Sequence, residues 1–178
     1  MEKGIKEDRT LTRLYDRNQF FEQAKNMINM HEPGFYVLSC INIDNFKVIN
    51  AQHGTETGDG VIRHVATSIN NCMYEIGGIC AHIAGDEFAA LYPMSYIKSN
   101  AIDDGHLKAS APDCIFQRIR LRVGRFVIDE PNLPVDSMYD SAKLAADNIR
   151  NNYERDIEYY KDCMRTNLVK RQQVIYEM

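Results

Sequence analysis

The sequence predicts an α/β domain in which a single mixed β-sheet is wrapped by helices. Residues Phe35 to Ile43 form an apolar run of strand length, which is typical of a central strand covered on both faces. Glu56 to Met73 places apolar residues at helical spacing and therefore predicts an amphipathic helix. Because further strand-like runs follow, with helical segments interspersed, the helices are expected to pack on one sheet.

The first half of the chain is predicted to fold as helix, strand, helix, helix. The first helix is expected between Leu11 and His31, with Asp16 or Asn18 as its N-cap, and it ends at Pro33-Gly34. A short helix, Asn45 to His53, is expected to end at Gly54. Alternation along the strand puts two sets of residues on opposite faces: Leu38, Cys40, Asn42 and Asp44, and Val37, Ser39, Ile41 and Ile43. The buried stripe of the long helix consists of Val61, Ile62, Val65, Ala66 and Ile69.

The second half is predicted to begin with a hairpin between Ile79 and Tyr92, followed by a loop from Met94 to Asp113. Ile115 to Ile128 has the composition of a strand but carries several arginines. A solvated strand face is the preferred explanation for them, and a basic stripe for an acidic partner is the alternative. Asp136 is expected to cap a helix that ends near Asn151. The residues expected to face inward from it are Met138, Ala142, Ala145, Ala146 and Ile149, and a short strand, Ile157 to Tyr160, follows.

Composition argues against several classes of function. The 178 residues are enough for one domain with a sizeable core, and a net charge of -4 gives no electrostatic support for binding nucleic acid or an anionic membrane. No apolar stretch reaches the roughly 20 residues that span a bilayer, and the N-terminal residues carry no signal-peptide pattern. The five cysteines are odd in number and scattered, so reduced thiols and a cytoplasmic location are expected.

The clearest functional signal is the stretch Ala84-Gly85-Asp86-Glu87-Phe88. It lies between two strand-like runs, and Gly85 supplies the backbone freedom that a tight hairpin tip requires. The tip would hold two adjacent carboxylates, Asp86 and Glu87, at the rim of the sheet, within reach of a cation. Taken alone, the stretch is better explained as an ordinary solvated acidic turn.

Three stretches in this order resemble the GGDEF family, the diguanylate cyclase domains of bacterial signalling proteins. Leu11 to Arg17 is close to the family's L-T-G-L-x-N-R, and the stretch from Asn42 to Asp59 is similar to D-I-D-x-F-K-x-I-N-D-x-x-G-H-x-x-G-D. The third stretch is Ala84 to Phe88, and Gly124 matches the glycine of a later S-I-G strand. The resemblance extends from about Leu11 to about Asp162.

The resemblance implies a fold related to the palm of polymerases and to adenylyl cyclases. It also implies a reaction that joins two GTP molecules into cyclic di-GMP with release of diphosphate, each GTP being held by one subunit of an antiparallel homodimer. Two divalent cations, usually Mg²⁺, would polarise the phosphates and lower the pKa of the attacking 3′-hydroxyl.

The resemblance assigns substrate contacts residue by residue. Asn50 and Asp59 fall on the two guanine-contacting positions, and a carboxylate suits guanine's adjacent N1–H and amino donors. Phe46 and Lys47 match positions whose backbone amides meet the terminal phosphates at a helix start. Arg150 falls where active members carry a phosphate-binding lysine, whereas Glu154 stands at a second basic position, where a carboxylate would repel the phosphates. The alternative for Asn50 and Asp59 is a purely structural role in their helices.

The resemblance assigns the metal ligands to Asn42, the carbonyl of Ile43, and Asp86, with Asp86 and Glu87 as catalytic residues. Active members carry aspartate at the first of these positions, so Asn42 keeps an oxygen but loses a full negative charge. Magnesium prefers anionic oxygen ligands, and the loss is expected to weaken two-metal catalysis by orders of magnitude. Asp44 is a possible replacement ligand. Asn42 is also explained as a strand-end residue that satisfies nearby backbone groups.

These observations predict a degenerate GGDEF domain, residues 1–163, that binds GTP with Mg²⁺ and serves cyclic di-GMP signalling as a regulatory or dimerising module. An active diguanylate cyclase and a protein-interaction platform with an empty pocket are the alternatives. The polar segment 164–178 is expected to be a connector helix toward a missing downstream domain, such as a cyclic di-GMP phosphodiesterase (EAL) domain.

Overall fold

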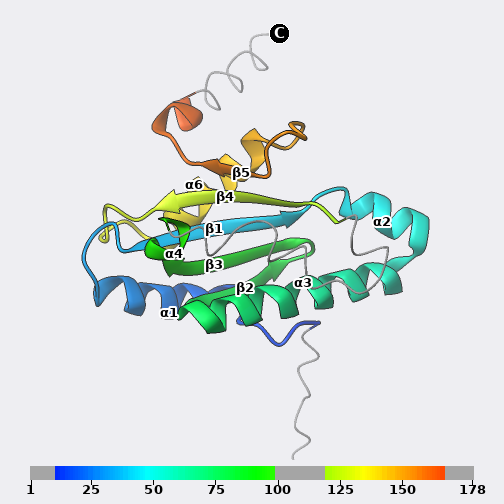
Figure 1. Cartoon of the computed structure of the whole chain (residues 1–178), viewed down its shortest axis with the longest axis horizontal. Helices are drawn as coiled ribbons and strands as arrows, with labels where there is room; N and C mark the ends of the chain where they lie inside the picture. The colour runs from blue at the N-terminus through cyan, green and yellow to red at the C-terminus, as the bar shows by residue number, and fades with distance from the viewer. Residues whose placement is uncertain (1–10, 99–118, 167–178) are drawn as a thin grey trace, which may run out of the picture.

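The central strand is β1, Tyr36–Ile43, and every one of its residues is buried. The structure, a computed structural model, describes residues 11–98 and 119–166. In its five-stranded sheet the order is β2-β3-β1-β4-β5, with β1 antiparallel to both neighbours and β5 parallel to β4 (Figure 1). The predicted mixed sheet with β1 at its centre is therefore confirmed. The other elements are α1 Arg17–Asn29, α2 Phe46–His53, α3 Thr55–Ile76, β2 Ile79–Ala84, β3 Glu87–Pro93, α4 Ser95–Lys98, β4 Leu121–Val127, α6 Val135–Asn148 and β5 Ile157–Tyr159.

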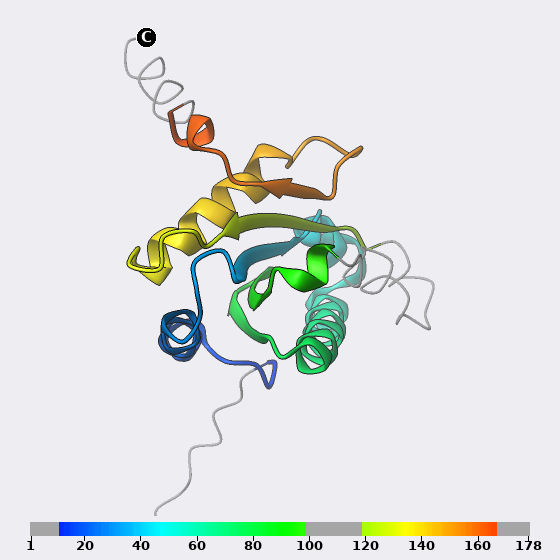
Figure 2. The same cartoon turned by 60° about the vertical axis from the view of Figure 1, so that its left-hand side comes forward.

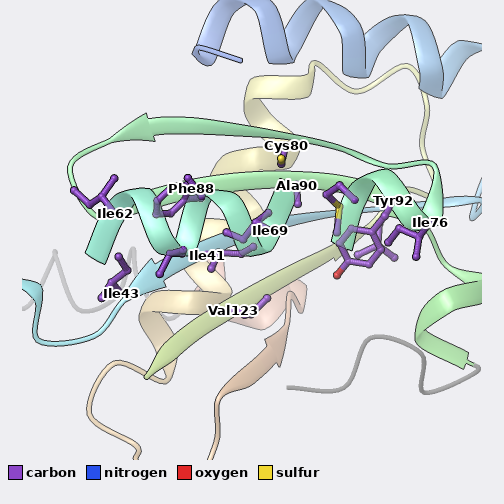
Figure 3. Close-up of a cluster of buried hydrophobic side chains, with 14 of the residues drawn as sticks. Ile41, Ile43, Ile62, Ile69, Ile76, Cys80, Phe88, Ala90, Tyr92 and Val123 are labelled. Carbon is purple, nitrogen blue, oxygen red and sulfur yellow. The ribbon is translucent and has the colours of Figure 1, made fainter. Parts of the chain in front are cut away.

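Helices cover both faces of the sheet. Figure 2 shows α3 on one side of it and α1 and α6 on the other. The first face carries Val37, Ile41 and Ile43 of β1, which belong to one apolar cluster with the predicted stripe of α3 (Figure 3). Leu38 and Cys40 face the other way, into a cluster with α1 and α6. The predicted alternation along β1 is thus confirmed.

The first helix begins at Arg17, and its N-cap is Asp16. The Asp16 carboxylate accepts a hydrogen bond from the backbone N–H of Gln19 at 2.9 Å, and the Gln19 side chain accepts one from the N–H of Asp16 at 3.1 Å. This reciprocal arrangement is a capping box. Tyr15, just before it, forms a parallel bridge with Ala81 of β2.

Replacing Asp16 with alanine is expected to lower the free energy of unfolding by about 1 kcal/mol, because the orphan N–H groups of the first turn lose their acceptor. Asn18 is the matched control, since Asn18→Ala changes an exposed residue of the same turn that takes no part in the cap. Urea denaturation of the two variants checks the prediction. Equal losses would contradict the role of Asp16.

The connections around α2, α3 and the hairpin follow the sequence closely. Gly54, with φ of +85°, ends α2 and leads into α3, as predicted. The hairpin tip between β2 and β3 contains Gly85 with φ of +54°, a conformation that favours glycine. Among the described residues, no helix is long and apolar enough to cross a membrane. Four cysteines fall within the described ranges, and none of these four is in a disulfide with another described cysteine.

Several predictions for the second half need correction. The segment predicted as loop from Met94 begins with the short helix α4, and residues 99–113 lie outside the described residues. The predicted strand from Ile115 begins only at Leu121, and 115–118 also lie outside. Asp136 is not the cap of α6: Pro134 occupies that position, and the Asp136 carboxylate accepts the neighbouring N–H of Ser137 instead.

Only the first residues of the predicted connector helix, 164–166, lie within the described residues. Residues 162–166 are helical, and 167–178 lie outside the described residues. The predicted boundary between a domain at 1–163 and a connector at 164–178 stays a prediction. The predicted inward face of α6 is confirmed, since Met138, Ala142, Ala145, Ala146 and Ile149 are all buried.

Candidate functional site

Asn42 and Glu87 face each other at one end of the sheet. Asn42 is the last but one residue of β1, and the ladder pairs it with Glu87, the first residue of β3. The backbone N–H of Ile43 donates to the carbonyl of Asp86 at 3.1 Å, which fixes the hairpin tip against the end of β1. The structure thus brings together Asn42, Ile43, Asp86 and Glu87, the residues that sequence reasoning placed in one site.

The Glu87 carboxylate is held by two side chains of α6. It accepts a hydrogen bond from the Tyr139 hydroxyl at 2.6 Å, and the Lys143 ammonium lies 3.0 Å from Oε1 and 2.8 Å from Oε2. Burial alone would raise the pKa of Glu87, but the hydrogen bonds from Lys143 and Tyr139 lower it below its ordinary value. The pKa of Lys143 is raised, because the contact with Glu87 outweighs the effect of burial. Glu87 is therefore an ionised, internally paired carboxylate.

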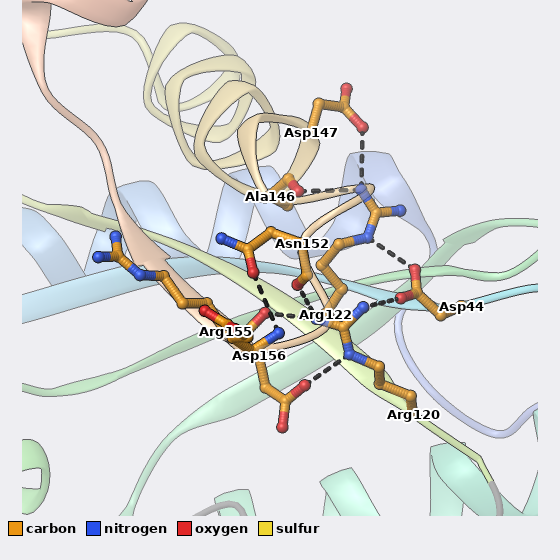
Figure 4. Close-up of polar contacts among 9 residues, drawn as sticks. Asp44, Arg120, Arg122, Ala146, Asp147, Asn152, Arg155 and Asp156 are labelled. Carbon is orange, nitrogen blue, oxygen red and sulfur yellow. Dashed lines mark hydrogen bonds and ion pairs between the residues drawn. The ribbon is translucent and has the colours of Figure 1, made fainter.

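The Asp44 carboxylate is bound by two arginines, Arg120 just before β4 and Arg122 within it (Figure 4). Arg120 Nη1 lies 2.5 Å from Asp44 Oδ2, and Arg122 Nε lies 2.8 Å from Oδ1. Only 7% of the Asp44 side chain and 3% of the Arg122 side chain are exposed. Since each oxygen already accepts from a guanidinium, Asp44 acts here as the partner of Arg120 and Arg122.

The two arginines also tie other segments to this end of the sheet. Arg120 Nε donates to Asp156 at 2.6 Å, and its Nη2 donates to the carbonyls of Asn152 and Arg155. Arg122 Nη1 donates to the carbonyl of Ala146 at 2.9 Å, near the end of α6 (Figure 4). The predicted solvated face is wrong for Arg122 and Arg125, which are buried, while Arg120 is partly exposed and Arg118 lies outside the described residues.

The predicted guanine contacts lie where α2 packs on α3. The ideal position of a Cβ on Gly58 would be 1.7 Å from Asn50 Oδ1 and 3.2 Å from the Phe46 ring, so only glycine admits these side chains. Asn50 Oδ1 is buried and has no hydrogen-bond partner in the part of the chain that the structure describes. Asp59, the next residue of α3, is exposed. The structure therefore buries the Asn50 carbonyl oxygen where α2 packs on α3 and leaves the Asp59 side chain exposed on α3.

The residues predicted to contact phosphate lie on two separate elements, the start of α2 and the segment after α6. Phe46 and Lys47 are the first two residues of α2, whose N-cap Asn45 has φ of +57° and makes no side-chain capping hydrogen bond. The amides at this helix start are thus left to other acceptors. Arg150 lies just beyond the end of α6 and is exposed, as is Glu154.

The protein side chains alone do not fit a magnesium ion. Asn42 is neutral, Glu87 is paired with Lys143, and Asp44 is paired with two arginines. Within residues 11–98 and 119–166, no three His, Cys, Asp or Glu side chains gather in a way that could hold a metal ion. The predicted ligands Asp86 and Ile43 stay predictions, because phosphate oxygens would have to complete the coordination.

Sequence reasoning missed four side chains of this site: Arg120, Arg122, Tyr139 and Lys143. A signal for the arginines was present, because Arg120, just before β4, and Arg122 and Gly124 within it are two residues apart, the spacing of one face of a strand. Gly124 packs directly against Ala142 and Ala146 of α6, which identifies that face as the α6 side.

The sequence matches the family described as "Diguanylate cyclase, GGDEF domain" over residues 8–106. It is 33% identical over 95 residues to the uncharacterized protein YtrP of Bacillus subtilis, covering 52% of this chain and 15% of YtrP. It is 29% identical over 133 residues to the probable diguanylate cyclase DgcT of Escherichia coli, covering 75% of this chain and 26% of DgcT. The chain thus spans about a quarter or less of the length of these relatives.

The fold is similar to that of a solved domain. The GGDEF domain of DgcB from Caulobacter crescentus, determined in complex with c-di-GMP, superposes with a TM-score of 0.71 at 21% identity. The superposition covers 88% of this chain and 98% of that one. This likeness supports the mixed sheet and its helices, which is the fold predicted from the sequence.

Proposed function

Because this chain belongs to the GGDEF family of diguanylate cyclase domains, we propose that it is a GTP-binding regulatory or dimerisation module that has lost cyclisation. The observation that carries the proposal is the pairing of neutral Asn42 with a Glu87 that is already neutralised by Lys143. Two-metal catalysis needs anionic oxygens that draw divalent ions to the reacting phosphates. At this end of the sheet, residue 42 carries no charge and the Glu87 carboxylate is paired with Lys143, which leaves Asp86 as the predicted metal ligand that still offers a carboxylate.

Three features support retained nucleotide binding. The start of α2 offers backbone amides with no side-chain cap, which is an arrangement that suits phosphate. Asn50 Oδ1 is a buried acceptor with no donor among residues 11–98 and 119–166, and guanine's edge supplies donors. Asp59 is exposed on the next helix and so accessible to a base. Mg²⁺ would then accompany the phosphates of the nucleotide.

The proposal extends to the signalling pathway, the oligomeric state and the downstream partner of this domain. The names of the relatives connect the family to cyclic di-GMP, and we place this chain in the same signalling chemistry. We further propose that it acts as a homodimer in the cytoplasm. A downstream EAL domain is the expected recipient of its regulation.

Calorimetric titration with GTP, with and without Mg²⁺, together with chromatography of the products after long incubation, tests the proposal. We expect heat of binding but no more cyclic di-GMP than Glu87→Gln yields. Product above that control would favour an active cyclase. The absence of heat at millimolar GTP would leave only an interaction platform.

Replacing Asp59 with asparagine is expected to weaken GTP binding about tenfold or more, since a hydrogen bond to a charged group contributes about 1.5–3 kcal/mol. Glu56→Gln is the matched control, because Glu56 is an exposed carboxylate in the first turn of the same helix. The same titration measures both variants, and equal affinities would remove Asp59 from the guanine site.

A further inference from the structure

Lys143 binds both oxygens of the Glu87 carboxylate. Its ammonium reaches from α6 to the first residue of β3 and contacts both carboxylate oxygens, at 3.0 Å and 2.8 Å. The Tyr139 hydroxyl donates a further hydrogen bond to Glu87 Oε1 at 2.6 Å. Only 14% of the Glu87 side chain is exposed, so a second cation has little room to approach it.

The other carboxylate beside Asn42 has the same kind of partner. Arg122 stands opposite Asn42 on β4, and it binds Asp44 together with Arg120. Asn42 therefore lies between two carboxylates, each already neutralised by a cation of the chain itself. A neutral residue at position 42 agrees with this pairing of carboxylates and cations, because a third carboxylate there would have no cationic side chain of its own.

We propose that the Lys143 ammonium is a built-in counter-cation that takes the place of a divalent metal ion at Glu87. The folded domain accordingly binds no divalent ion at this end of the sheet while it is free of nucleotide. The inference deepens the proposed function, since it explains how a cyclase-type site stays stable without metal. Two residues, and not Asn42 alone, then separate the site from one that holds a metal.

The contributions of Lys143 and Asn42 to metal binding can be separated by titrating the protein with Mn²⁺ in the absence of nucleotide. Electron paramagnetic resonance measures the concentration of the free ion. The wild type and Asn42→Asp are both expected to bind no Mn²⁺ at this site up to about 1 mM. Combining Asn42→Asp with Lys143→Gln is expected to bind Mn²⁺ at least tenfold more tightly than Asn42→Asp, because the carboxylates are freed from the competing ammonium. Glutamine is chosen because its amide can still donate to Glu87 and so preserve the fold.

Asn42→Asp combined with Lys161→Gln is the matched control. It has the same net charge as the test variant, but Lys161 is an exposed residue 4.0 Å from Glu158 on another element. Any gain limited to the Lys143 variant supports the inference, and equal gains in both pairs would reduce it to a net-charge effect and overturn it. Tight Mn²⁺ binding by Asn42→Asp alone, a single substitution that keeps Lys143, would also overturn it. Failure to bind GTP would contradict the proposed function, but it would not change the Mn²⁺ affinities measured for these variants.

Discussion

Replacing Gly124 with alanine is expected to destabilise the domain by about 3 kcal/mol or more, which places it among the most damaging single substitutions in the chain. A Cβ at this position would lie 1.9 Å from the carbonyl oxygen of Ala142 and 2.3 Å from the backbone nitrogen of Ala146. Both are backbone atoms of α6, so no side chain can rotate away. The helix itself would have to move off β4, which would disturb the contacts of Tyr139 and Lys143.

Urea denaturation followed by circular dichroism measures this loss, and Gly60→Ala is the matched control. Gly60 lies within α3 and has nothing within 4 Å of its ideal Cβ position. Alanine there is expected to raise the free energy of unfolding by about 0.5–1 kcal/mol through helix propensity. If both variants unfolded alike, the close approach of α6 to β4 would not be a determinant of stability.

Asp44→Asn is expected to cost about 3 kcal/mol of unfolding free energy, because it leaves the buried guanidinium of Arg122 and the partly buried one of Arg120 without their shared carboxylate. Of its contacts with described residues, Arg122 would keep the carbonyl of Ala146 and a 3.4 Å contact with Asp147. Because asparagine has nearly the same shape as aspartate, the loss of stability measures the contribution of the negative charge at position 44. Because the Asp44 carboxylate is paired with Arg120 and Arg122, the same loss is expected in the presence of a chelator.

Asp147→Asn is the control for this measurement, because Asp147 contacts the same Arg122 but its side chain is 46% exposed. Exposed ion pairs contribute at most about 1 kcal/mol, so a loss below that value is expected. Comparable losses for the two variants would mean that Asp44 has no special structural role. A stability of the wild type that rose with Mg²⁺ would instead favour Asp44 as a metal ligand.

The fold was largely predictable because its signals are local. The continuous apolar run of β1 predicts a central strand, and the glycines at 54 and 85 mark the turns where the structure has positive φ. The cap of α6 was not predictable in the same way. Asp136 is a good capping residue by type, but the chain turns into the helix two residues earlier, at Pro134.

The candidate site was predictable only in part. The strand ends bring Asn42 and Glu87 together, and that pairing follows from topology. The partners Lys143 and Arg122 come from elements far along the chain, and their side-chain positions depend on how α6 packs on β4. A run of arginines in a strand suggests solvent exposure by composition, whereas here Arg122 is buried because carboxylate and carbonyl acceptors surround it.

The guanidinium of Arg120 has a mechanical consequence for the last strand. β5 is joined to the sheet by only three residue pairs, all with β4, and Arg120 adds bonds to the carbonyls and carboxylate just before it. Segments held in this way open separately from the apolar centre of a protein, and salt weakens partly exposed ion pairs. Amide hydrogens of β5 should therefore exchange sooner as salt rises, while those of β1 stay protected. Because Asp44 shares this guanidinium, any event that displaces Asp44 would loosen the attachment of β5 as well.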